Sequence, residues 1–222
     1  MSKKLIRLSH NLTMDTPTYG NRNKLVTKHT TCDVNGYFIT ESNWQFSTNH
    51  IGTHIDTQKH FIKDGISITD IDDTFWIFEN VELIEITRET GKLIEWDDVS
   101  ANIRKSQSLE LLLIRTGYEK YRGEDKYWND NPGISSNCAN SLRKNLSSLR
   151  GIGFDFISLT SFNFRDDGKA AHKNILGGSK PFIIIEDMSL VKVNRKIVSL
   201  TVLPLFVENA DASPVSVIAQ ME

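Results

Sequence analysis

Cysteine is scarce in this chain, which has only Cys32 and Cys138 among its 222 residues. The two are far apart in sequence and form no CxxC pair, so a disulfide framework is not expected and both thiols should be reduced. Cys138 lies at helical spacing from leucines at 142, 146 and 149. This pattern is typical of the buried face of a helix and argues against a nucleophilic cysteine.

Long apolar runs and an excess of one charge sign are also missing. No segment approaches the ~18 consecutive apolar residues of a membrane span, and the N-terminus lacks the apolar core of a secretion signal. The chain has 26 Lys and Arg against 28 Asp and Glu, well interspersed. Without a basic surface, neither nucleic acid nor a membrane is expected as a partner. We therefore expect a cytoplasmic protein that acts on a small molecule.

Repeats, low-complexity segments and Pro/Gly-rich linkers are absent, and the whole chain has only five prolines. Its length suffices for one large domain that buries most of its apolar surface without needing disulfides or structural metal ions for stability. Hydrophobic residues make up 39% and charged residues 24%, which is typical of a soluble globular protein. We therefore predict a single domain spanning residues 1–222.

Hydrophobic periodicity indicates a mixture of strands and helices. Helices are predicted over residues 94–105, from Ser135 or Ser136 to about Arg150, and over 166–176. Gly151 or Gly153 should stop the second of these helices. Strands are predicted at 4–9, 25–31, 37–47, 81–86, 109–114, 153–157 and 181–185. The fold class predicted is α/β, with helices covering a β core.

Histidine is concentrated in one place, between His50 and His60, where three of the six histidines and a carboxylate fall within eleven residues. His50, His54, Asp56 and His60 are separated by even numbers of residues. In an extended strand they would share one face, whereas a helix would turn Asp56 away from His54. The intervening isoleucines and threonines are β-branched and suit a pleated surface. We therefore predict a strand that runs into a turn.

Imidazole nitrogens and carboxylates are ligands that Zn²⁺, Mn²⁺ and Fe²⁺ accept, and a set of two histidines and one carboxylate leaves coordination positions open for chemistry. The alternative is a strand whose histidines are merely hydrogen-bonded to their neighbours. Further ligands should come from elsewhere in the chain. The candidates are His172, on the predicted short helix, and Glu186, which closes the apolar strand 181–185.

The stretch His50 to His60 resembles the signature His-x-Gly-Thr-His-x-Asp-x-Pro-x-His of the cyclase family of metal-dependent amide hydrolases, which includes bacterial kynurenine formamidases. Six of its seven fixed residues are present, and Gln58 replaces the proline. The family proline would stiffen the turn before His60, so Gln58 should let it relax. The similarity extends along the chain to Leu8-Ser9-His10, to Pro17 with Tyr19-Gly20, to Leu113–Gly117 and to Gly151–Ser158.

The resemblance implies a swivelling β/β/α fold and a site with two metal ions, zinc or alternatively manganese. His50, His54, Asp56 and Glu186 would hold one ion, and Asp56, His172 and Glu186 the other, with the carboxylates bridging. His60 would be the catalytic proton donor and acceptor, and Tyr19 would contact the substrate. The implied reaction is the hydrolysis of N-formylkynurenine to kynurenine and formate. A homodimer or homotetramer is also implied, and the aromatic loop 118–128 suits an interface or a lid.

Several alternatives remain open from the sequence. Within the family, the substrate could be a cyclic amide such as isatin, or a lactone. His54, Asp56 and His172 also fit the facial triad of a non-haem iron oxygenase, although that class expects an all-β barrel. A homologue that keeps the metal without turnover, or a purely structural metal, would be non-catalytic. His10 is a candidate helper at the site.

Overall fold

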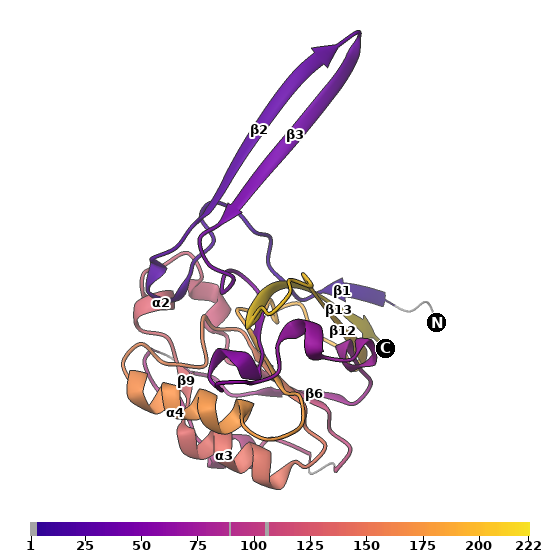
Figure 1. Cartoon of the computed structure of the whole chain (residues 1–222). Coiled ribbons are helices and arrows are strands. Elements are labelled where there is room, and N and C mark those ends of the chain that lie inside the picture. Colours follow the sequence, from indigo (N-terminus) through magenta and orange to yellow (C-terminus); the bar gives the residue numbers. More distant parts are fainter. Residues whose placement is uncertain (1–3, 89, 105–106) are drawn as a thin grey trace.

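A single mixed sheet organises the molecule. The structure, a computed structural model, describes residues 4–88, 90–104 and 107–222. Within these residues a nine-stranded sheet runs through the body (Figure 1). Its order is β5 (Ile77–Phe78), β12 (Ile197–Pro204), β13 (Ala212–Met221), β4 (His54–Asp56), β11 (Ile183–Glu186), β10 (Gly151–Phe154), β8 (Leu111–Arg115) and β6 (Val81–Glu85), and β1 (Lys4–Arg7) also pairs with β13.

The short strand β4 lies where the two halves of this sheet meet. On one side, β11, β10, β8 and β6 run parallel to one another, as expected for strands joined by helical crossovers. On the other side β13, β12, β5 and β1 are antiparallel. β4 pairs antiparallel with both β11 and β13, so it is flanked by strands from distant parts of the sequence.

Helices cover one face of the sheet, which confirms the predicted α/β class. Leu112 and Ile114 of β8 point to that face and pack with buried residues of α1 (Trp96–Ser100), α3 (Ser136–Asn145) and α4 (Arg165–Leu176). Leu111 and Leu113 point to the opposite face and pack with residues of β12 and β13. Because strands of both halves meet in this second cluster, the sheet curls over itself. A further α-helix, α2 (Lys126–Asn129), has a single turn.

Strands β2 (Leu25–Val34) and β3 (Tyr37–Phe46) form a long hairpin that projects from the body (Figure 1). Both were predicted as strands, but they pair with each other in a separate sheet and do not join the main sheet. Residues 28–45 are all exposed. We call residues 25–46 the arm.

Two predicted helices are shorter in the structure. The helix predicted to reach Arg150 ends at Asn145, because the chain must turn before it enters β10 beside β8. Gly151 and Gly153 therefore do not stop a helix but belong to β10, which moves the strand predicted at 153–157 toward the N-terminus. The predicted start of this helix is confirmed, because Ser135 caps it: the Ser135 hydroxyl accepts a hydrogen bond of 3.1 Å from the backbone N–H of Cys138.

The helix predicted over 94–105 is reduced to α1, because residue 94 pairs in a small parallel ladder. That ladder joins β7 (Leu93–Ile94) to β9 (Gly133–Ile134). Residue 105 lies outside the described residues.

Short 3-10 helices occur at Tyr19–Asn21, Gln58–His60, Ile68–Asp70, Asp73–Trp76 and Tyr118–Tyr121. Among the described residues, no helix combines the length and apolar character needed to cross a bilayer.

Candidate metal centre

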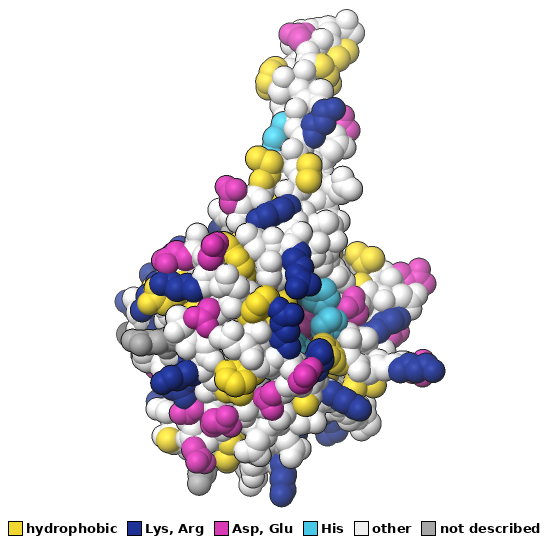
Figure 2. All heavy atoms as spheres, turned by 90° about the vertical axis from the view of Figure 1, so that its left-hand side faces the viewer, with side chains coloured by type: hydrophobic (Ala, Val, Ile, Leu, Met, Phe, Trp, Pro, Cys, Tyr) yellow, Lys and Arg dark blue, Asp and Glu magenta, His cyan; other side chains and the backbone are white. Residues whose placement is uncertain are grey.

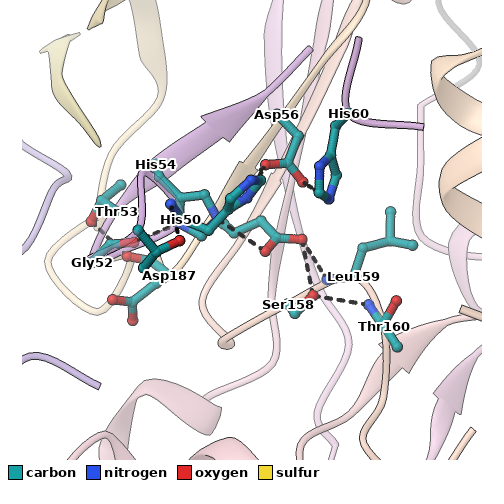
Figure 3. A network of polar contacts seen from close by, with 12 residues as sticks. His50, Gly52, Thr53, His54, Asp56, His60, Ser158, Leu159, Thr160 and Asp187 are labelled. Carbon is teal, nitrogen blue, oxygen red and sulfur yellow. Dashed lines mark hydrogen bonds and ion pairs between the residues drawn. The ribbon is translucent and has the colours of Figure 1, made fainter. Parts of the chain in front are cut away.

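Strand pairing brings together two of the predicted ligands that lie far apart in sequence. In the ladder between β4 and β11, His54 stands directly opposite Glu186. Residues opposite each other in an antiparallel pair share a face, so both side chains project to the same side of the sheet. Asp56 lies two residues along β4 and shares that face. All three side chains project to the face covered by helices, because Ile55 and Ile185, which alternate with them, pack on the opposite face. Figure 3 shows His54 and Asp56 at this site.

The strand predicted from His50 runs into a turn as expected, but it is shorter than predicted. Only His54–Asp56 forms a strand, and Gly52 has a left-handed backbone with φ of +61°. An L-residue with a side chain would be strained at this angle, so the glycine permits the turn that folds His50 back toward Asp56. His60 lies at the end of the 3-10 helix Gln58–His60. Turns, rather than strand alternation, bring these two histidines to the site.

Buried and incompletely paired atoms lie at the centre of the cluster. His54 Nδ1 is 2.8 Å from the carbonyl oxygen of Gly52, which leaves Nε2 as the free ligand atom. That Nε2 lies 3.3 Å from Glu186 Oε2 and 3.8 Å from Asp56 Oδ1. His54 Nε2 and Asp56 Oδ1 are both buried and make close ion-pair contacts but no hydrogen bond of good geometry. Buried polar atoms are rarely left without a hydrogen bond, and a cation between them would satisfy both.

Helix α4 contributes His172 from the opposite side. His172 Nδ1 is 2.9 Å from the carbonyl oxygen of Gly168 and 3.1 Å from Thr160 Oγ1, so its Nε2 faces the cluster. This Nε2 lies 3.7 Å from Asp56 Oδ2 and 3.7 Å from Glu186 Oε1. Glu186 Oε1 in turn accepts a 2.7 Å hydrogen bond from the backbone N–H of Leu159. These second contacts fix the direction in which each side chain presents its ligand atom.

Asp211 joins the site although no sequence motif pointed to it. Its Oδ2 lies 3.1 Å from His50 Nε2 and 3.0 Å from His60 Nδ1. Asp211 precedes β13, whose first residue, Ala212, is paired with Asp56. Its arrival at the site therefore depends on a strand that the sequence analysis did not identify. His50 Nδ1 is left facing Asp56 Oδ1 at 3.0 Å, and His60 Nε2 faces Asp56 Oδ2 at 4.0 Å.

Electrostatics show that the cluster attracts positive charge. Burial alone would lower the pKa of His50, but Asp56 and Asp211 outweigh it and raise this pKa to about 10. For His172, Asp56 and Glu186 likewise overcome burial and raise the pKa to about 9. Burial opposes ionisation of Asp56, but the neighbouring histidines hold its pKa well below the usual range. Protons on the imidazoles thus neutralise carboxylates that a metal ion would otherwise neutralise.

The residues present fit a metal centre. Among the described residues, three groups each bring ligand atoms within 4.8 Å of one another, and two of these groups share Asp56. One is His50 with His54 and Asp56, and the other is Asp56 with His60 and His172. Glu186 approaches both sides through its two oxygens. The five predicted ligands thus surround one small volume, and His60 and Asp211 lie at its exposed edge.

A cavity of about 300 Å³ opens over the cluster. Tyr19, the predicted substrate contact, lines it, and its ring lies 5.6 Å from that of Phe162. Phe61 stacks on His172 at 4.5 Å and forms part of the wall. Sequence reasoning missed the other lining residues, which include Ile157, Ser158, Thr160, Arg165 and Lys169. The aromatic and apolar part of this wall suits a flat substrate.

A second polar layer lies behind the ligands. Thr53, next to His54, donates a 2.6 Å hydrogen bond to the carbonyl oxygen of Asp187, next to Glu186, and so ties the two ligand-bearing strands together (Figure 3). The Asp187 carboxylate is fully buried and pairs with Arg122 at 2.7 Å. His10 lies 4.0 Å from Asp187 in this layer and does not line the cavity. The structure thus places His10 behind the ligands rather than in the substrate pocket.

Comparisons with known proteins agree with this arrangement. The cyclase family model ("Putative cyclase") matches residues 6–160, more than half of the chain. An uncharacterised protein of Haemophilus influenzae is 32% identical over 110 residues, which cover 49% of this chain and 78% of that protein. An uncharacterised protein of Methanocaldococcus jannaschii is 28% identical over 189 residues, with 84% of each chain covered.

Solved structures share the fold across the whole chain. A potential metal-dependent hydrolase with cyclase activity has a TM-score of 0.77 at 22% identity, with 100% of this chain and 99% of that chain covered. Isatin hydrolase A from Labrenzia aggregata has a TM-score of 0.78 at 20% identity, with 99% and 94% covered. The resemblance seen in the His50–His60 motif is confirmed: this chain belongs to the cyclase family.

Proposed function

We propose that this protein is a metal-dependent hydrolase of amides, with aryl formamides such as N-formylkynurenine as its substrates. The observation that supports this best is the set of imidazole and carboxylate groups that converge, with buried atoms that lack a hydrogen bond, at the base of an aromatic-walled cavity. The divalent ions implied by the family are two zinc ions, with manganese as the alternative. Such ions, when bound, supply an activated water at neutral pH and polarise a carbonyl group.

The protein's own residues then have distinct tasks. Asp56 and Glu186 bring negative charge, and His50, His54 and His172 complete the ligand sets. His60 is held through Nδ1 by Asp211, so its Nε2 faces the reacting atoms. During hydrolysis the amide C–N bond breaks while the carbonyl carbon gains a bond to the oxygen of water. His60 accepts the proton released from water and donates it to the leaving nitrogen, which yields formate and the aryl amine.

A second candidate substrate class is the cyclic amides. Several structures that share the fold are isatin hydrolases, with TM-scores of 0.73–0.78. The same groups would serve ring opening, because the ring C–N bond breaks in the same way and His60 protonates the same nitrogen. Tyr19 and Phe61 would face either kind of aromatic substrate.

The structure does not favour the iron-oxygenase alternative. His54, Asp56 and His172 do converge, but so do His50, His60 and Glu186, which that mechanism would leave without a role. The fold is also a mixed sheet covered by helices on one face rather than an all-β barrel. The purely structural metal site is disfavoured as well. Asp56 and Glu186 are buried beneath a cavity that is open to a substrate, whereas a structural metal site is closed.

The expected homo-oligomer is supported by the arm. Cross-strand pairing places Val34 opposite Tyr37 and Cys32 opposite Ile39, so these four apolar side chains share one face at the tip. Tyr37 is 73% exposed. Apolar patches of this kind on a projecting element are typical of protein–protein contacts. The body also exposes an apolar segment, Leu205–Val207, so a second copy of this chain offers a further exposed apolar surface.

Two variants test the proposed chemistry together with metal analysis. His60→Ala should lower turnover of N-formylkynurenine by about 10²–10⁴-fold, the usual contribution of general acid–base catalysis, while the metal content stays unchanged. Asp56→Ala should lose metal and activity together, because it removes a carboxylate shared by both ligand groups. Full activity in His60→Ala, or a full metal complement in Asp56→Ala, would contradict these roles. Metal-loaded protein inert toward N-formylkynurenine, simple aryl formamides and isatin would point to the non-catalytic alternative.

A further inference from the structure

Helix α4 carries two cations on the same side as His172. Lys169 and Arg165 precede His172 by three and seven residues, and positions separated in this way lie on one face of a helix. At 1.5 Å per residue they lie about 5 Å and about 10 Å along the axis from His172. All three line the cavity over the metal centre. From His172 toward the cavity mouth, α4 therefore presents first Lys169 and then Arg165.

Arg165 has no ion-pair partner among the described residues. Its guanidinium lies over the ring of Phe162, with Cζ 3.9 Å from the centroid. That ring neighbours Tyr19. Burial raises the pKa of the Tyr19 phenol, and the charge of Arg165 opposes this rise. Stacking on an aromatic ring fixes the guanidinium plane and leaves its N–H edges available to a ligand.

Lys169 is only weakly engaged. Its ammonium pairs with Asp166 at 2.8 Å, but both side chains are largely exposed, and such surface pairs contribute little. The acidic residues that line the cavity, Asp56 and Glu186, are the proposed metal ligands and would be neutralised by bound ions. Figure 2 shows Lys and Arg side chains on the surface around the exposed histidines, with Asp and Glu side chains among them. Arg165 and Lys169 thus add positive charge at the cavity mouth, whereas the carboxylates at its base would bind cations.

We propose that Arg165, assisted by Lys169, binds an anionic group of the substrate, so that the preferred substrates are aryl amides that carry a carboxylate about 5–10 Å from the scissile bond. This inference rests on the proposed hydrolase function and narrows its substrate class. Arg165 would accept the carboxylate in a bidentate, charge-assisted pair. Lys169 would add a second charge closer to the metals. Neutral aryl amides of the same size would lack both contacts.

Binding of a matched ligand pair tests the inference directly. 4-Aminobenzoate and 4-aminobenzamide differ in charge but not in shape, and calorimetry with metal-loaded protein gives both affinities. A charge-assisted hydrogen bond corresponds to about 10–100-fold, so the wild type should bind the carboxylate more tightly by that factor. Arg165→Gln should reduce the preference at least tenfold, and Lys169→Gln should reduce it less. Lys173→Gln, an exposed cation of the same helix outside the cavity lining, is the matched control and should keep the preference.

Equal affinity of the wild type for both ligands would overturn the inference. So would a carboxylate preference that survives in the Arg165→Gln/Lys169→Gln double variant, because the carboxylate would then bind the metals instead. Turnover of 4-formamidobenzoate against 4-formamidobenzamide is measured in parallel, and the ratio of the two kcat/KM values should follow the ratio of affinities. If neither amide is hydrolysed, the proposed function fails, while the binding ratios still decide whether the cavity mouth selects anions.

Discussion

Asp211 connects two histidines whose roles differ. Through one oxygen it contacts both His50, a proposed ligand, and His60, the proposed proton carrier. A carboxylate that accepts from one ring nitrogen fixes which tautomer presents its lone pair at the other. Because Asp211 does so for both rings, it aligns ligand and proton carrier at the same time.

Replacing Asp211 by asparagine should therefore impair catalysis without dismantling the fold. The side chain keeps its size, but its charge is lost and it no longer favours an Nδ1–H on His60. Loss of an outer contact of this kind typically costs 10–100-fold, and we expect a fall of about that size in kcat at saturating metal. Metal affinity, measured separately by calorimetry, should weaken as well through His50. An Asp211→Asn enzyme with wild-type kcat and wild-type metal affinity would show that the contact has no functional role.

A site residue was easiest to predict from the sequence where other residues of the site lie close to it along the chain. The ligand types at His50, His54, Asp56 and His60 could be recognised because they lie within one motif. Asp211 could not, since it reaches the site only through the pairing of β13 with β4. Gln58 shows a different limit. The sequence predicted a relaxed turn at this position, whereas the side chain is buried and donates a 2.8 Å hydrogen bond to the carbonyl oxygen of Gly178, beyond α4.

At the scale of elements, the seating of α4 decides where His172 points. Gly168 faces the loop that carries Thr160, and a Cβ at this glycine would lie 2.5 Å from Thr160 Cγ2 and Oγ1. Both residues also contact His172 Nδ1. The close approach of helix and loop thus holds the imidazole in place, and it depends on the missing side chain at residue 168.

Gly168→Ala should weaken metal binding even though alanine favours helices. The added methyl group forces α4 away from the loop, and overpacking of this kind costs about 1–3 kcal/mol. We expect metal affinity to fall about tenfold or more, measured by competition with a chelator. Ala170→Gly, at an exposed position of the same helix, is the matched control. It should lose about 1 kcal/mol of stability through helix propensity and keep its metal affinity. Equal metal affinity in both variants would refute the role of this contact.

Elements with a strong local pattern were predicted, whereas those defined by tertiary pairing were not. The apolar run 109–114 correctly predicted β8, and the acidic residues before His172 correctly predicted the start of α4. Residues 94 and 151 were misassigned because ladders with residues 134 and 111 override their helical periodicity. The arm illustrates the same limit. Its two strands were recognisable, but nothing local indicates that they leave the main sheet.

For the whole molecule, the cluster of buried acids and histidines links stability to pH and metal. In metal-free protein the pKa values of about 10 for His50 and about 9 for His172 lie above the unfolded value of about 6.5. A raised pKa in the folded state stabilises the protein below the unfolded pKa, and this contribution is lost as pH rises through the folded pKa. The free energy of unfolding of metal-free protein should therefore fall between pH 6.5 and 10, by an amount on the order of a few kcal/mol.

Urea unfolding at several pH values, with and without a chelator, measures this effect. Metal ions need deprotonated imidazoles, so metal affinity should rise over the same pH window while metal-free stability falls. The metal-loaded protein should accordingly become more stable relative to the metal-free protein as pH increases. A pH-independent difference between the two forms would mean that His50 and His172 do not exchange protons for metal.

The projecting arm leads to a prediction about assembly. If a second copy covers the tip, Tyr37→Ser with Ile39→Ser removes two apolar anchors from one face of the arm. Burying a large apolar side chain contributes about 1.5–3 kcal/mol, so the two substitutions together should weaken the dimer by about 100-fold or more.

Light scattering after size-exclusion chromatography should show a dimer or tetramer for the wild type and a monomer for the double variant at micromolar concentration. Thr40→Ser, next to Ile39 but on the opposite face, should keep the wild-type mass. Because these residues are exposed and outside both core clusters, circular dichroism and thermal unfolding of the monomeric variant should report an intact body. A wild-type protein that is monomeric at this concentration would contradict the proposed homo-oligomer.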